Sequence, residues 1–320
     1  MSAHNDIQEC GLRMLAERTD RTLLVDIPSR IFSPLAEQLR WDSLRAGNLR
    51  LEDWSGIKAF ASLDSADESE DAELVITLVQ QDGNRICRRH SIADWQGLAL
   101  FAQSTLSNNN QTGSGQAYKI GLRWSGNHDE LGLAVPLSPL CIPVEKVQAP
   151  SKPTSKPGPL KVFVTKDVSS ALTDLAEQSL KHEVEVGGCL LGRMPDLDNI
   201  VITEAACASK AEASEGQFSF DPRFWLDVNT RSVGTGTKIL GWFHSHLCDN
   251  GYPTSLSSLD ILVFHAHFVA PWSVGALICA SADESEVKWF GWQDGCVVPV
   301  AAAETESSQL VSKTPKGVSK

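Results

Sequence analysis

The chain has 320 residues, 42% of them hydrophobic, and a formal net charge of −12 at pH 7. That length and apolar content suffice for two packed domains, whereas the acidic balance argues against nucleic acid, whose phosphates favour lysine and arginine. No apolar run is long enough for a membrane-spanning helix and the N-terminus lacks the pattern of a signal peptide, so we expect a cytoplasmic protein with no membrane partner.

Residues 1–147 are expected to form a small α+β domain, for which the sequence indicates no role. Alternating apolar residues and turn residues predict strands and hairpins, and a helical pattern follows them. The expected elements are strands at 73–80 and 85–91 joined by a turn at 81–84, a helix at 94–107, and a second hairpin of 118–124 and 131–137 around Gly126-Asn127.

Residues 148–159 hold four prolines and no apolar periodicity, which is typical of a semi-extended linker. The linker precedes a C-terminal domain at 160–302, and we expect a disordered tail at 303–320. The domain alternates strands and helices, which predicts a mixed α/β fold with a helix on each side of a sheet. Its expected strands lie at 160–164, around Glu185, and at 200–206, 239–243, 274–280 and 287–292, the last of them; its expected helices lie at 168–181 and 224–231.

Two histidines and an aspartate stand close together between Gly241 and Asp260. His244 and His246 end an apolar strand with i, i+2 spacing, so they face the same way. Asp260 lies in the first turn of an expected helix, whose apolar pattern includes Leu259 and Leu262, and there it would project toward the histidines. Two imidazoles and one carboxylate suit Zn²⁺ with a fourth position left for water, which is the arrangement of a catalytic zinc.

Each part of this pattern also has a purely structural interpretation. Ser257 and Asp260 before an apolar run resemble a helix capping box, with Ser257 at the N-cap. An isolated H-x-H is more often a surface or core pair than a metal site. A capping box, however, would not require H-x-H upstream at the end of an apolar strand, so the combination favours a metal site.

A metal-activated water also needs a base to take its proton, and the stretch 183–192 supplies a candidate. It is a glycine-rich apolar strand preceded by Glu183 and Glu185. Gly187 and Gly188 carry no side chain, so another backbone can approach closely. The structural alternative is that both glutamates are solvated residues at the end of a helix.

Together these segments resemble the JAMM (also MPN or JAB) zinc metalloprotease family over residues 160–300. Glu185 to Gly192 matches the family pattern E-x-x-G-x-x-x-G, and His244-Ser245-His246 followed by Ser257 and Asp260 matches H-[ST]-H and S-x-x-D. The stretch 218–222, F-S-F-D-P, is similar to the turn before a family helix. Ten residues separate His246 from Ser257 where the family usually has seven, and we expect a turn at 249–251 to absorb the insertion.

The resemblance implies an α-β-α domain of cytidine-deaminase-like fold and a role for each matched residue. His244, His246 and Asp260 would bind Zn²⁺, Glu185 would be the catalytic base with Glu183 as its substitute, and Ser257 would stabilise the oxyanion. The family implies a peptidase or isopeptidase that cuts after the C-terminal glycine of ubiquitin or a ubiquitin-like protein. Such a substrate would also imply conjugation-pathway enzymes as partners.

Two alternatives remain at this point. Some family members are non-catalytic scaffold or interaction subunits, although these lose ligands that this chain retains. A second, structural zinc at Cys248, His265 and His267 is a further hypothesis, and a helix surface with two polar histidines explains that pattern as well. The eight cysteines are scattered without C-x-x-C, and several of them, such as Cys189 and Cys279, lie in apolar strands where reduced buried thiols are ordinary.

Overall fold

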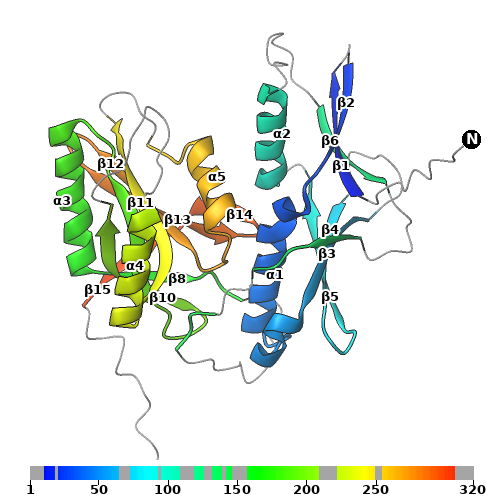
Figure 1. Cartoon of the computed structure of the whole chain (residues 1–320), viewed down its shortest axis with the longest axis horizontal. Helices are drawn as coiled ribbons and strands as arrows, with labels where there is room; N and C mark the ends of the chain where they lie inside the picture. The colour runs from blue at the N-terminus through cyan, green and yellow to red at the C-terminus, as the bar shows by residue number, and fades with distance from the viewer. Residues whose placement is uncertain are drawn as a thin grey trace, which may run out of the picture. The chain divides into compact units, whose positions relative to one another are not determined.

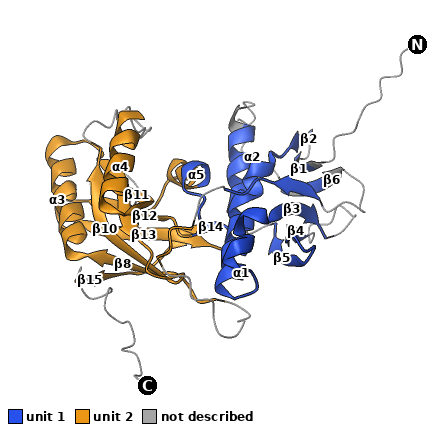
Figure 2. Cartoon of the chain, turned by 60° about the horizontal axis from the view of Figure 1, so that its bottom comes forward, with its two compact units in different colours: residues 1–139, 265–271, 294–296 blue, residues 140–264, 272–293, 297–320 orange. Residues whose placement is uncertain are grey.

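The computed structural model describes residues 11–18, 21–64, 73–92, 95–108, 119–125, 132–138, 142–145, 157–208, 222–248 and 254–306. The chain divides into two compact units, coloured separately in Figure 2. Unit 1 comprises residues 1–139 together with 265–271 and 294–296, and unit 2 comprises the rest. The division thus falls at 139/140, before the proline-rich stretch.

Unit 1 is an α+β unit with two small antiparallel sheets, of strand orders β2-β1-β6 and β5-β4-β3-β7. Helix α1 packs on β4. The elements are β1 (Gly11–Arg18), β2 (Arg21–Asp26), α1 (Ser33–Arg45), β3 (Lys58–Leu63), β4 (Glu73–Val79), β5 (Arg85–Ser91), α2 (Gln96–Asn108), β6 (Lys119–Ser125) and β7 (Leu133–Val135), with short 3-10 helices at Ser29–Phe32 and Leu51–Gly56.

The second expected hairpin of this unit is wrong. Strands β6 and β7 do not pair with each other, because β6 pairs with β1 and β7 pairs with β3, in different sheets. Local alternation sets where a strand forms, but its partner is chosen by burial against distant segments. Gly126-Asn127, around which the hairpin was expected to turn, lies outside the described residues.

Unit 2 is built on an eight-stranded mixed sheet of order β14-β13-β12-β11-β9-β10-β8-β15 (Figure 1). Its central strand β11 pairs antiparallel with β9 and parallel with β12. Apart from the end of α5 and the first residue of β14, which belong to unit 1, the elements are β8 (Lys161–Thr165), α3 (Lys166–His182), β9 (Gly187–Arg193), β10 (Asn199–Cys207), α4 (Pro222–Thr235), β11 (Lys238–Leu247), α5 (Ser258–His267), β12 (Val274–Ala280), β13 (Glu286–Gln293), β14 (Cys296–Pro299) and β15 (Ala302–Thr305).

Helices cover both faces of this sheet. On one face α3 reaches Ser245 of β11, and the Oγ atoms of Ser179 and Ser245 lie 2.8 Å apart. On the other face Val228 of α4 packs with Cys189 of β9, which is the register partner of Trp242. Phe264 of α5 packs edge-on against Trp242 on that same face, with ring centroids 5.9 Å apart. A mixed α/β fold with helices on both sides of the sheet is therefore present, as the sequence predicts.

The strand at 287–292, expected to be the last, is followed by two more strands. Residues 303–305 therefore belong to the domain and not to the expected disordered tail at 303–320. Asp294 and Gly295 have φ of 48° and 75° and join β13 to β14 as a two-residue turn. This Asp-Gly pair is a hairpin signal that the sequence analysis did not use. Strand β15 then pairs parallel with β8, so Ala303, Glu304 and Thr305 are ordered. The composition of this segment does not predict a strand. The strand is stabilised instead by its pairing with the edge of β8.

None of the helices in the described ranges is long and apolar enough to cross a membrane. The cysteines in those ranges are all free.

Replacing Gly188 by alanine is expected to destabilise the protein by about 3 kcal/mol, at the upper end of the range for overpacking a core. A Cβ at this position would collide with the carbonyl oxygen of Ala206 and lie 2.8 Å from Cε1 of Phe243. Urea unfolding measures the change. Gly234→Ala in α4 is the control, because a Cβ there meets nothing within 4 Å, and its expected effect is a gain of up to about 1 kcal/mol. Equal stability of the two variants would contradict the close approach.

Candidate metal centre

Strand β11 places both histidines on one face of the sheet, over positions that leave room for them. His244 is the register partner of Gly187 on β9 and of Leu277 on β12, and His246 is opposite Cys279. Both rings are buried, at 2% and 4% exposure. Because Gly187 has no side chain, no side chain from this position of β9 crowds the His244 ring. The two imidazoles are thus held in a protein interior that exposes few of their atoms to water.

The orientation of the His244 ring is set by packing. Trp242, two residues earlier on the same face, stacks on it with ring centroids 4.6 Å apart and an interplanar angle of 4°. The Nδ1 atom of His244 is buried without a hydrogen-bond partner among the described residues. Stacking by Trp242 therefore takes the orienting role that a hydrogen bond to the second ring nitrogen usually has in metal sites.

Asp260 reaches the histidines from the first turn of α5. The backbone N–H of Ser257 donates to Oδ2 of Asp260 at 2.6 Å, and the N–H of Asp260 donates to Oγ of Ser257 at 3.2 Å. This reciprocal pair is the capping box that the sequence predicts. It also fixes the carboxylate, whose two oxygens lie near the two histidines. Capping and the approach to the histidines are therefore compatible, because each uses part of the same carboxylate.

The apolar pattern of α5 is only partly as expected. Leu259 and Leu262 are 52% and 38% exposed, whereas Phe264 is fully buried against Trp242 and Trp292. The buried stripe of a helix depends on where its neighbours lie, and the sequence pattern around Leu259 did not reveal this.

The donor atoms of three side chains converge on one point. Nε2 of His244 lies 3.0 Å from Nε2 of His246 and 3.1 Å from Oδ1 of Asp260, and Nε2 of His246 lies 3.5 Å from Oδ2 of Asp260. A tetrahedral ion with ligands at 2.0–2.1 Å separates its donor atoms by about 3.4 Å. Within the described residues this is the one group of three such side chains with all donor atoms within 4.8 Å. The donor set fits a divalent transition metal with at least one open position.

The charges of the site favour an ionised Asp260. Burial alone would raise the pKa of this carboxyl, but hydrogen bonds with His244 and His246, the charge of His244 and the hydrogen bond with Ser257 hold it well below its usual range. Asp260 is thus an anion at neutral pH, which is the form that binds a cation.

Glu185 lies beside this centre, in the segment between α3 and β9. It is half-buried, and its burial raises the pKa of the carboxyl. The charges of His244 and His246 lower that pKa and the charge of Asp260 raises it, so all three residues act on it electrostatically. Glu183, the substitute base, is exposed and ends α3 in the left-handed conformation with φ of 54°. Of the two glutamates, Glu185 is therefore the one associated with the histidines and Asp260.

Two buried serines next to Glu185 were missed by the sequence analysis. Ser245 was noted in the motif without a role, and Ser179 was not singled out. The signal for Ser179 was its place at the end of the buried stripe of α3, where Leu172, Leu175 and Ala176 precede it at helical spacing. A serine in an apolar stripe requires a hydrogen-bond partner in the core.

The hypothesis of a second zinc gains no support. Cys248, His265 and His267 are all described, yet they belong to no group of three ligands whose donor atoms lie close together. Cys248 instead interacts with Cys279, and burial and this neighbour raise the pKa of the Cys279 thiol to about 11.

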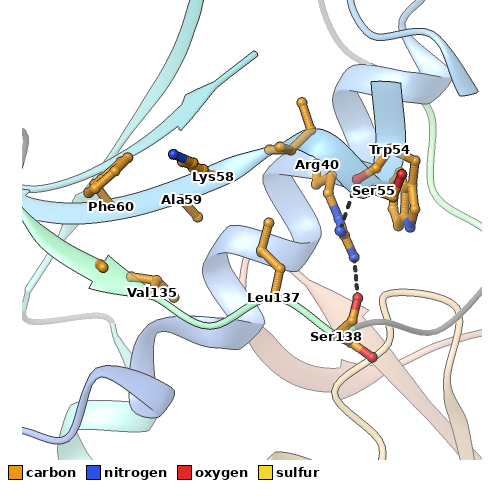
Figure 3. A pocket seen from close by; sticks show the side chains of 11 residues that line it. Arg40, Trp54, Ser55, Lys58, Ala59, Phe60, Val135, Leu137 and Ser138 are labelled. Carbon is orange, nitrogen blue, oxygen red and sulfur yellow. Dashed lines mark hydrogen bonds between the residues drawn. The ribbon is translucent and has the colours of Figure 1, made fainter. Parts of the chain in front are cut away.

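Unit 1 contains a separate cavity of about 440 Å³, between β3 and the chain after β7 (Figure 3). Its arginine is occupied within the fold. The Arg40 guanidinium stacks 3.7 Å over the Trp54 ring, donates to the carbonyls of Trp54 and Ser138, and pairs with Glu37 at 2.6 Å. The lining contains no histidine, cysteine or carboxylate. This cavity therefore lacks the side chains that usually bind a metal ion.

No family model matches the chain, and no curated protein matches it. Among solved structures the chain is similar to the solution structure of protein DSY2949 from Desulfitobacterium hafniense, with 25% sequence identity and a TM-score of 0.38. The match covers 45% of this chain and 93% of the other. At that TM-score the likeness carries no conclusion about the site.

The donor geometry predicts that the protein binds about one divalent transition metal ion per chain. Removing one of three ligands in His244→Ala is expected to abolish binding at micromolar concentrations, because two donors hold such an ion weakly. Elemental mass spectrometry after dialysis against zinc, cobalt or iron measures the content. His182→Ala is the matched control, since this histidine is exposed at the end of α3. A folded wild-type chain that takes up no metal would show that the three side chains only bond to one another.

Proposed function

We propose that this protein is a zinc-dependent peptidase or isopeptidase of the JAMM/MPN type, which cuts after the C-terminal glycine of ubiquitin or a ubiquitin-like protein. The observation that carries the proposal is the convergence of His244, His246 and Asp260 beside a half-buried Glu185. Three metal ligands and one unshared carboxylate are the groups that metal-assisted amide hydrolysis requires. The choice of zinc and the substrate class come from the sequence resemblance.

The residues of the site divide the work between binding and proton transfer. His244, His246 and Asp260 would hold the ion, and the ion, when bound, supplies Lewis-acid activation of water and of the scissile carbonyl. Glu185 is not needed as a ligand, so its carboxylate can accept a proton from the attacking water and deliver it to the leaving amine. Burial favours this role, because a carboxyl whose pKa is raised is a better base near neutral pH.

Ser257 is suited to stabilise the oxyanion of the tetrahedral intermediate. Its Oγ already accepts a hydrogen bond from the N–H of Asp260 at 3.2 Å, so its own O–H can still donate. The capping box holds this hydroxyl on the same helix turn as Asp260, which keeps the donor beside the metal ligands. A fixed donor of this kind needs no reorganisation during the reaction.

Exposed apolar side chains next to the site favour a polypeptide substrate. Val184 precedes Glu185 and is 45% exposed, and Leu259 precedes Asp260 and is 52% exposed. Solvent-facing apolar side chains beside a catalytic group are suited to contacts with an extended chain.

The proposal is tested by incubating the metal-loaded protein with ubiquitin-like fusions and conjugates and measuring cleavage by mass spectrometry. The wild type should release a product that ends in the C-terminal glycine. Glu185→Gln should retain the metal and lose hydrolysis by at least about a hundredfold, because it removes the base and no ligand. Glu183→Gln is the matched control and should retain activity. An active Glu185→Gln variant would refute the assigned base, and a metal-loaded wild type that cleaves no substrate would favour a scaffold.

Ser257→Ala should retain the metal and lower kcat by about a hundredfold, the scale of one oxyanion donor. The variant also loses the helix cap, so a fall of about 1 kcal/mol in stability is expected and is measured separately by thermal unfolding. The neighbouring Ser258→Ala, at an exposed position, should change neither property. A Ser257→Ala enzyme with reduced stability but unchanged kcat would limit Ser257 to capping.

A further inference from the structure

A chain of hydrogen bonds runs through two buried hydroxyls and ends on both sides of Glu185. The N–H of Val186 donates to Oγ of Ser245 at 2.9 Å, the two serine Oγ atoms lie 2.8 Å apart, and Oγ of Ser179 donates to the carbonyl of Val184 at 2.6 Å. A carbonyl only accepts, so the Ser179 hydroxyl proton is used there. Ser245 must therefore donate to Ser179, so each hydrogen bond in the chain has a defined donor and a defined acceptor.

The backbone bonds of the same residues close this arrangement. The N–H of Ser245 donates to the carbonyl of Val186 at 2.8 Å, and the N–H of Val184 donates to the carbonyl of Ser179 at 3.2 Å. Both neighbours of Glu185 are thus held through backbone donors and acceptors, one by β11 and one by α3. Glu185 is the single residue between the two clamped positions, so its Cα has little freedom to move.

Both serines are fully buried, with 0% exposure. Without either hydroxyl, a backbone group beside Glu185 loses its hydrogen bond at a part-buried position. Ser245 lies between His244 and His246 in sequence but on the opposite face of β11. The chain therefore links the α3 side of the sheet to the position of a carboxylate that acts with the histidines.

We propose that Ser179 and Ser245 are positioning residues that hold the Glu185 carboxylate at the metal centre. Both serines lie on the α3 side of the sheet, opposite the histidines, so they would act through Glu185 rather than by direct contact with an ion held there. Their catalytic effect rests on the proposed function, because it acts through the base of that reaction. Misplacing a catalytic group by about 1 Å can lower a rate about a hundredfold, so two short hydrogen bonds on the adjacent residues can control turnover.

The test compares Ser245→Ala and Ser179→Ala with the control Ser170→Ala. Ser170 is an exposed serine of α3, the helix that also contains Ser179. In the first two variants kcat should fall by about a hundredfold while KM changes by less than about threefold. Metal content should stay at the wild-type level. Ser245→Thr, which retains a hydroxyl, should recover most of kcat. If Ser245 had only a structural role, threonine and alanine variants of equal stability would have the same kcat.

A second readout does not depend on activity. Amide hydrogen exchange of Val186 should be faster in Ser245→Ala by about tenfold, the scale of one lost hydrogen bond, and unchanged in Ser170→Ala. Wild-type kcat with full metal content in both alanine variants would overturn the proposal, and so would unchanged exchange at Val186. If one alanine variant fails to fold, the other and Ser245→Thr decide. An inactive wild type would refute the proposed function alone, and the exchange experiment would still decide whether the serines hold the segment.

Discussion

The site depends on the two-residue alternation of one buried strand. Strand β11 is paired on both sides, with β9 and β12, so it cannot rotate or slip without breaking both ladders. This constraint directs His244 and His246 to one face and Ser245 to the other. A shift of one residue would bury the histidines against α3 and turn the serine toward Asp260. The histidine pair on one face and the hydrogen-bonded support of Glu185 on the other are therefore two consequences of a single register.

Asp260 shows that the two interpretations of its motif do not exclude each other. Its carboxylate takes part in a capping box with Ser257, and it also lies 3.1 Å from Nε2 of His244. A carboxylate has enough lone pairs for both partners. The start of α5 is thus stabilised by the same side chain that completes the group with His244 and His246, so the capping box also orients the carboxylate.

The sequence predicted local features well and remote pairings poorly. Strands β5 and β12 have the predicted bounds, because these follow from short-range periodicity. His244, His246 and Asp260 come together as expected, which the i, i+2 spacing of the histidines and the resemblance of the motif predicted. The pairings of β6 and β7 depend on segments far along the chain. The same holds for β15, because its composition is typical of a disordered tail and its strand conformation depends on pairing with β8. Ser179 was missed because its partner, Ser245, lies 66 residues away.

Strand β15 has a practical consequence for the boundaries of this domain. It covers the outer edge of β8, whose Val162 and Val164 are buried. A protein shortened to end at residue 301 would present β8 as a bare, unprotected margin of the sheet. Open margins of this kind recruit further chains through their unsatisfied amides and carbonyls, which leads to self-association and poor recovery during purification.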